Sequence, residues 1–126
     1  NAEDFFDALQ IPYRIVSLCG GELGKVSSKT YDLEAWFPGQ QKYRELVSCS
    51  NCTDYQARGL LVKYRDKPHE QSKFVHTLNS TLVATERTLI AIMENHQLKD
   101  GSIKVPKPLK PYVGNLEIIK ANKTSP

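Results

Sequence analysis

The sequence predicts an α+β fold in which an antiparallel β-sheet is flanked by helices. Runs rich in apolar and β-branched residues are joined by loops without a crossover helix, which favours antiparallel pairing. The segment Thr30 to Phe37 alternates apolar and polar side chains with the period of a half-buried strand. One long helical pattern, over residues 82–97, follows the strands and can back the sheet.

Length and composition restrict the class of protein. The 126 residues are 40% hydrophobic and 25% charged, which excludes a fibre and a wholly disordered chain and fits one domain or part of one. The sequence contains no run of about 18 apolar residues, so we expect no membrane partner. It begins at Asn1 without an initiator Met or a signal-peptide profile, and we expect a segment of a longer protein.

The N-terminal elements follow from local patterns. Helical spacing of apolar residues predicts a helix over Ala2 to Gln10, which Pro12 ends. Apolar and β-branched residues predict a strand over Tyr13 to Cys19, stopped by two glycines. In the next strand, which the Pro38-Gly39 turn closes, one face is expected to carry four side chains. These are Tyr31, Leu33, Ala35 and Phe37.

Further strands and one short helix are predicted in the middle of the chain. We expect a strand over Tyr43 to Ser50, a short helix over Asp54 to Arg58 and a strand over Leu60 to Arg65. The polar segment Asp66 to Ser72 is a hairpin loop before the last strand, Phe74 to Asn79.

The C-terminal third is predicted as a buried helix followed by an extended tail. The helix spans Leu82 to Gln97, and its apolar residues are expected to face the core. The expected core-facing set is Leu82, Leu89, Ile90, Ile92 and Met93. After Asp100-Gly101 the chain is rich in proline and is expected to run extended along the surface.

Charge is distributed unevenly along the chain. The net formal charge is +3, but residues 1–60 carry −2 and residues 61–126 carry +5. The lysines of the C-terminal segment form either a solvated surface or a phosphate-contacting one. They are Lys99, Lys104, Lys107, Lys110, Lys120 and Lys123.

The chain has three cysteines, and this odd number argues against a closed disulfide framework. Cys49 and Cys52 form a C-x-x-C pair, and the histidines supply no matching spacing for a zinc site. Ordinary buried thiols, a redox pair and a metal site all remain open, and a reducing intracellular setting is favoured.

Arg87 stands one residue before the strongly apolar part of the predicted helix, where a lone guanidinium would be costly. It therefore needs an anion, which is either a carboxylate of this chain or a ligand phosphate.

Four positions of equal parity would project from one face if the strand stays regular, namely Val75, Thr77, Asn79 and Thr81. Their amide and hydroxyl groups could bind a small polar ligand. Alternatively, Ser80, Thr81 and Thr85 are of the type that caps a helix.

Glu45 and Ser48 offer oxygen ligands to a Mg²⁺ ion that bridges phosphates. Residues three apart lie on opposite faces of a regular strand, so both reach one ion only if the strand bulges between them.

Several strings occur together in the order found in the catalytic domain of seryl-tRNA synthetases. They are Ile11 to Arg14, Tyr31 to Pro38, Tyr43 to Glu45, Val47 to Arg58, Leu78 to Thr81, Ala84 to Thr88, Glu94-Asn95, Asp100 to Pro106 and Pro111 to Gly114. The last two resemble the bacterial and organellar branch. Residues 1–114 therefore resemble the C-terminal part of this domain, and residues 115–126 are expected to form a C-terminal tail.

The resemblance implies a class II synthetase fold and a serine–tRNA ligase that forms seryl-adenylate from serine and ATP, then seryl-tRNA. It implies L-serine, ATP and tRNA(Ser) as partners, a homodimer, and Mg²⁺. The compartment is expected to be the cytoplasm or the mitochondrial matrix. A non-catalytic module that binds RNA or protein is the alternative.

The resemblance also assigns site residues. Glu45, Leu46, Val47 and Ser48 match the ATP segment, with Glu45 and Ser48 near the magnesium ion. Asn79 and Thr81 match the serine pocket. Arg87 matches the arginine of the third signature motif, on the ATP phosphates, so Arg87 and Glu45 are the catalytic candidates. The first two signature motifs and the tRNA-binding arm are expected upstream of Asn1, so the 126 residues alone are expected to be inactive.

Overall fold

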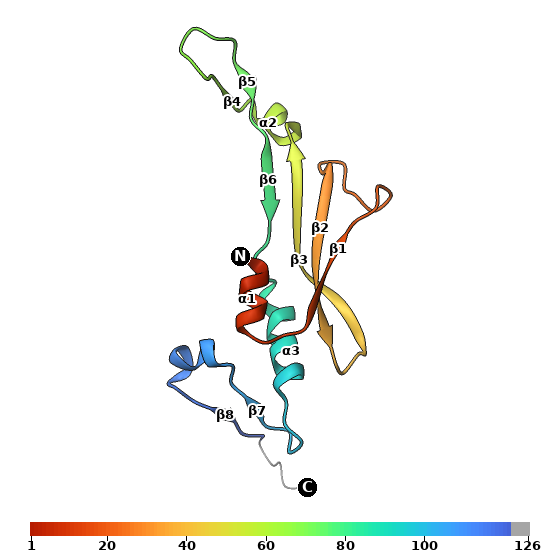
Figure 1. Ribbon diagram of the computed structural model, residues 1–126, viewed down its shortest axis with the longest axis vertical. Helices are drawn as coiled ribbons and strands as arrows, with labels where there is room; N and C mark the ends of the chain where they lie inside the picture. Colours follow the sequence, from red (N-terminus) through yellow and green to blue (C-terminus); the bar gives the residue numbers. More distant parts are fainter. Residues whose placement is uncertain (122–126) are drawn as a thin grey trace.

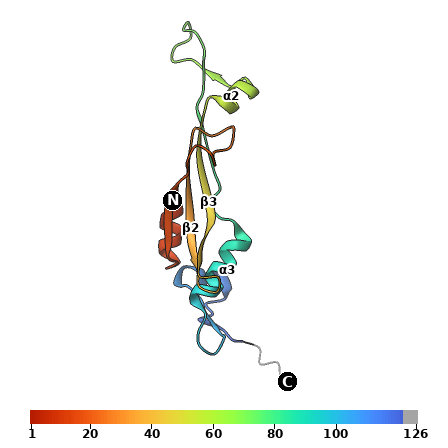
Figure 2. The same cartoon turned by 90° about the vertical axis from the view of Figure 1, so that its right-hand side faces the viewer.

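The computed structural model describes residues 1–121 and has an elongated shape (Figures 1 and 2). Its helices are α1 (Ala2–Ala8), α2 (Tyr55–Leu60), α3 (Thr85–His96) and the 3₁₀ helix η1 (Lys107–Val113). Its strands are β1 (Tyr13–Ser17), β2 (Lys29–Phe37), β3 (Lys42–Thr53), β4 (Lys63–Tyr64), β5 (Lys73–Phe74), β6 (Thr77–Ser80), β7 (Ile103–Lys104) and β8 (Ile118–Ile119).

The central sheet has four strands in the order β1-β2-β3-β6, and every neighbouring pair is antiparallel. Two small sheets, β4-β5 and β7-β8, lie at opposite ends of the molecule (Figure 1). The predicted fold class is therefore confirmed. Among residues 1–121, no helix is long and apolar enough to cross a membrane.

The core lies between the sheet and helices α1 and α3, which meet where His96 Nε2 lies 2.8 Å from the Leu9 carbonyl oxygen (Figure 1). Alternation along β2 buries Leu33, Ala35 and Phe37 as predicted. Tyr31 shares their face but is 43% exposed, because it lies next to an open hollow on that face. The buried core residues are Phe6, Leu9, Ile11, Leu33, Ala35, Phe37, Leu46, Val47 and Ala91.

The predicted core face of the long helix is wrong for most of its residues. The side chains of α3 that are buried are Thr88 and Ala91, three residues apart. Ile92 packs against the core, whereas the other four predicted core positions are largely exposed. These are Leu82, Leu89, Ile90 and Met93.

Two further predictions are corrected by the pairing of short strands. The expected strand over Phe74 to Asn79 is divided because β5 pairs with β4 whereas β6 pairs with β3. The expected extended tail instead forms β7, η1 and β8, in which β7 pairs with β8. Within this segment, Lys110 Nζ forms a salt bridge with Glu117 Oε1 at 2.6 Å. Residues 122–126 of the predicted tail, with Lys123, lie outside the described residues.

Candidate active site

A β-bulge in β3 sets the orientation of the predicted magnesium ligands. Opposite β2, Leu33 pairs with Val47 but Glu34 pairs with Glu45, so Leu46 is an extra residue. Leu46 and Val47 are both buried in the core, although consecutive residues of a regular strand face opposite ways. The strand therefore has the bulge that a shared magnesium ion requires.

The register shows that Glu45 and Ser48 lie on the same face of the sheet. Glu45 is opposite Glu34, and Ser48 is opposite Asp32. Asp32 and Glu34 are two residues apart in a regular strand, so they and their partners share one face. This face is opposite to the one that carries Leu33 and Val47 into the core.

The predicted serine-binding residues extend the same polar face. Asn79 is opposite Ser50 of β3, and the backbone N–H of Thr81 donates to the Ser48 carbonyl at 3.4 Å. Asn79 and Thr81 thus occupy successive same-face positions beside Ser50 and Ser48. Both side chains are exposed. Among the described residues, the N-terminus of α3 has no side-chain cap, since its N-cap residue is Ala84, so helix capping does not explain these hydroxyls.

Arg87 lies in the first turn of α3 and reaches the edge of this face. Its Nη1 donates to the Glu45 carbonyl oxygen at 2.6 Å and lies 3.8 Å from Glu45 Oε2. The residues of β6 pair only with β3 residues 49–53, which leaves the edge of β3 beside Glu45 open for this contact. Both side chains of the ion pair are about half exposed. The guanidinium is therefore paired within the chain and also accessible to a ligand.

An open hollow contains both catalytic candidates. Its lining includes Glu45 and Arg87 together with Arg44, a second guanidinium that was not among the residues predicted from sequence. Arg44 Nε donates to Gln40 Oε1 at 2.9 Å, and Gln40 lines the same hollow. Arg44 is opposite Ala35 in the register, so its side chain leaves β3 on the face opposite to that of Glu45, and the hollow, which Phe37 and Ile90 also line, lies at the edge of the sheet. The sequence signal for Arg44 was its position next to Glu45.

The residues present fit a magnesium ion in its usual mode, in which one or two protein oxygen ligands are completed by substrate phosphates and water. Glu45 and Ser48 supply a carboxylate and a hydroxyl on one face. Within residues 1–121, no cluster of three His, Cys, Asp or Glu side chains could hold a metal by itself.

Leu46 and Val47, the other residues predicted to bind ATP, have side chains that are 1% and 3% exposed. These side chains belong to the core, so a contact with a nucleotide is open only to their backbone atoms.

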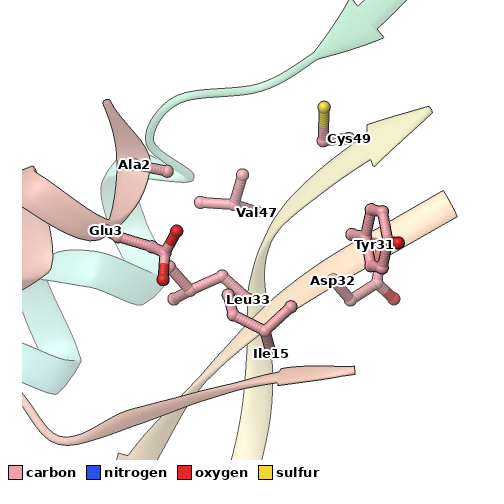
Figure 3. A pocket seen from close by; sticks show the side chains of 8 residues that line it. All are labelled: Ala2, Glu3, Ile15, Tyr31, Asp32, Leu33, Val47 and Cys49. Carbon is pink, nitrogen blue, oxygen red and sulfur yellow. The ribbon is translucent and has the colours of Figure 1, made fainter. Parts of the chain in front are cut away.

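The other face of the sheet holds a separate, mostly apolar hollow (Figure 3). It is lined by Ala2, Glu3, Ile15, Tyr31, Asp32, Leu33, Val47 and Cys49. Cys49 and Cys19 are exposed and Cys52 is buried, and all three thiols are free. The C-x-x-C pair lies within β3 and does not open a helix, so it lacks the helix N-terminus that activates a redox pair. The alternative of ordinary buried thiols therefore holds for Cys52 and not for Cys19 or Cys49.

Comparisons with known proteins identify the family of the chain. Residues 1–96 match the family model described as the tRNA synthetase class II core domain (G, H, P, S and T). Over 123 residues the chain is 57% identical to a serine–tRNA ligase of Thermococcus sibiricus, covering 98% of this chain and 27% of that protein. The chain thus spans about a quarter of the length of this curated relative.

Two solved structures are also similar to this chain. Seryl-tRNA synthetase from Pyrococcus horikoshii complexed with ATP has a TM-score of 0.93 and 52% identity, and the match covers 97% of this chain and 27% of that one. Cytoplasmic serine–tRNA ligase from Naegleria fowleri in complex with AMP has a TM-score of 0.90 and 50% identity, over 97% and 29% of the two chains. The chain therefore belongs to the family of the tRNA synthetase class II core domain (G, H, P, S and T) and resembles its seryl-tRNA synthetases.

Proposed function

We propose that the protein containing this chain is a serine–tRNA ligase, which activates L-serine with ATP and transfers it to tRNA(Ser). The observation that carries the proposal is that Glu45, Ser48, Asn79 and Thr81 share one sheet face, with Arg87 at its edge. Similarity to serine–tRNA ligases over nearly the whole chain supports the same activity.

Each side chain has a defined role in this proposal. Arg87 binds the phosphates of ATP and stabilises the negative charge that develops on the departing pyrophosphate. Asn79 and Thr81 orient serine, with the Thr81 hydroxyl on the substrate hydroxyl. Holding the serine carboxylate beside the α-phosphate reduces the entropic cost of the first step.

Mg²⁺, held by Glu45 and Ser48, would neutralise phosphate charge when bound. The Glu45 carboxylate also keeps the Arg87 guanidinium at the edge of the site before the nucleotide enters. Loss of either charge therefore affects the position of the other.

The remaining properties belong to the same proposal. The whole protein is a homodimer that works in the cytoplasm, with the mitochondrial matrix as the alternative compartment. The 126 residues by themselves are not expected to activate serine. The resemblance assigns the acid that binds the serine ammonium to the second signature motif, which is expected upstream of Asn1, and activation needs both parts of the site.

The test is serine-dependent exchange of labelled pyrophosphate into ATP by the full-length protein. Arg87→Ala is expected to lower the exchange rate by about 10²–10³-fold, the usual effect of removing one preorganised charge-stabilising donor. Arg87→Lys should retain part of the rate because it keeps the charge without the bidentate geometry. Lys104→Ala, an exposed cation on β7, is the control and should leave the rate unchanged.

Exchange that is absent from the wild-type protein, together with retained tRNA binding, would instead support a non-catalytic module. Exchange that Arg87→Ala leaves unchanged would remove Arg87 from the site.

A further inference from the structure

The hairpin formed by β4 and β5 projects beyond the central sheet, next to α2 (Figure 1). Each strand has only two residues, and an isolated two-stranded sheet of this size is marginally stable. We define the hairpin surface as Lys63, Tyr64, Arg65 and Lys73, all of which are exposed. None of these residues belongs to the candidate active site.

Part of the positive charge on this surface is not neutralised. Lys73 Nζ bonds Asp66 Oδ2 at 2.7 Å. Lys67 Nζ lies 3.9 Å from Glu70 Oε1. By contrast, Lys63 and Arg65 have no carboxylate within ion-pair distance among the described residues. These two adjacent cations are therefore available to an anionic partner.

Aromatic rings of the hairpin contact Lys63 and Lys73, and also Arg58 of the neighbouring helix α2. Lys63 Nζ lies 4.8 Å from the centroid of the Phe74 ring, and Arg58 Cζ lies 5.0 Å from the same centroid. Lys73 Nζ lies 5.9 Å from the Tyr64 centroid. Cation–π contacts of this kind reduce side-chain freedom, so less entropy is lost when a partner binds.

The hairpin is also connected directly to the candidate site. Phe74 of β5 and Asn79 of β6 are five residues apart, roughly 17 Å in extended backbone. β6 then leads through Thr81 to α3 and Arg87. A long anionic substrate whose end lies at the site can therefore extend along the chain to the hairpin.

We propose that the hairpin surface binds the phosphate backbone of the tRNA substrate through Lys63 and Arg65. This inference rests on the proposed function, since tRNA is the long polyanion that the reaction uses. Contacts to phosphate position an RNA without reading its sequence. The hairpin therefore contributes to the affinity for tRNA and to its position on the protein, whereas other parts of the protein recognise the tRNA sequence.

The experiment measures binding of fluorescently labelled tRNA(Ser) to the full-length protein as a function of salt. Lys63→Gln/Arg65→Gln is expected to weaken binding and to reduce the slope of log affinity against log salt by about 2, or about 1 for each lost phosphate contact. The KM for tRNA should rise while serine-dependent pyrophosphate exchange stays at the wild-type rate.

Two control variants make the result specific. Lys63→Arg/Arg65→Lys retains both charges and should keep affinity and slope near the wild-type values. Lys104→Gln/Lys107→Gln removes two exposed lysines at the other end of the molecule and should leave the slope unchanged.

The hairpin inference and the proposed function can fail separately. Unchanged tRNA affinity and slope in Lys63→Gln/Arg65→Gln, with normal exchange, would overturn the hairpin inference and leave the proposed function intact. The same applies if that variant loses only thermal stability, because the two cations would then stabilise the hairpin, as the Lys63 contact with Phe74 can, without binding tRNA. Absence of exchange in the wild-type protein would instead overturn the proposed function.

Discussion

Glu45 takes part in two interactions through different atoms. Its backbone carbonyl accepts a hydrogen bond from Arg87, while its carboxylate lies 3.8 Å from the same guanidinium and remains open to solvent. Substitution of the side chain therefore leaves the backbone contact in place. This separation allows the carboxylate to be tested alone.

Glu45→Gln is expected to raise the Mg²⁺ concentration that gives half-maximal exchange by at least about tenfold, since loss even of an outer partner of a metal ligand costs about 10–100-fold. This concentration is measured by titrating Mg²⁺ and following the pyrophosphate exchange rate of the full-length protein. Glu22→Gln, an exposed loop position, is the control. An unchanged Mg²⁺ requirement in Glu45→Gln would show that this carboxylate does not bind the ion.

Thr88 is a second residue whose polar and apolar parts can be separated. Its side chain is buried in α3, and Thr88 Oγ1 has no hydrogen-bond partner within residues 1–121. Thr88→Val keeps the shape and removes the unsatisfied hydroxyl, so the free energy of unfolding is expected to rise by about 1 kcal/mol. Urea denaturation of the chain measures the change. Thr85→Val, exposed on the same helix, should change it little, and a loss of stability in Thr88→Val would reveal a partner for the hydroxyl.

At the scale of elements, the sequence predicted what depends on local pattern. The alternation in β2 identified Leu33, Ala35 and Phe37 as core residues, and parity placed Asn79 and Thr81 on one face. For the helix α3, the same kind of local pattern predicted mostly the wrong core-facing side chains. Its buried positions are Thr88 and Ala91 and its most apolar residues are exposed, because tertiary packing and not apolarity alone decides which side of the helix meets the sheet.

The sequence did not predict the bulge at Leu46 directly. It indicated only that Glu45 and Ser48 could bind one metal ion if the strand bulged between them. Two consecutive apolar residues, Leu46 and Val47, are compatible with either a regular strand buried on both faces or a bulge. Pairing with β2 decides between them, and pairing depends on residues far apart in the sequence. The same holds for Arg44, which joins the hollow through tertiary contacts.

The turn between α3 and β7 carries a charge-dependent contact. The backbone N–H and the hydroxyl of Ser102 both donate to Asp100 Oδ1, at 3.1 and 2.6 Å. The Ser102 side-chain hydrogen bond, followed by the backbone one, lowers the pKa of Asp100 below its usual value. The folded state thus favours the ionised carboxylate.

Because the folded pKa of Asp100 is depressed, its contribution to stability is fully present above the unfolded pKa of about 4 and is lost as pH falls through the folded value. Asp100→Asn removes this dependence. The thermal midpoint of the wild-type chain should exceed that of the variant near neutral pH, and the difference should shrink below about pH 4. A difference that stays constant through this range would contradict the assigned role of the charge.

At the scale of the whole molecule, the surface is large for the mass. The accessible area is 9387 Å², whereas a compact monomer of 14.2 kDa exposes about 6,800 Å². Large apolar side chains contribute to the excess, including Leu89 and Met93 on α3. Contiguous exposed apolar surface of this kind promotes association.

The 126-residue chain is therefore expected to associate in solution and to bind a hydrophobic dye such as ANS. Leu89→Gln/Met93→Gln should lower both dye fluorescence and the apparent mass in light scattering, with little change in thermal midpoint because neither side chain is buried. Lys107→Gln serves as a control on a charged surface. A monomeric wild-type chain that does not bind the dye would contradict the expectation.

The bulge in β3 also affects how related sequences should be aligned. Removal of Leu46 would leave Glu45 and Ser48 two positions apart, and a regular strand would then still place both on one face. A relative with a one-residue gap at Leu46 would thus lose a core side chain but keep the orientation of both oxygen ligands. A one-residue gap at Cys49 would have the opposite effect, since it would separate the face of Ser48 from that of Ser50 and Asn79.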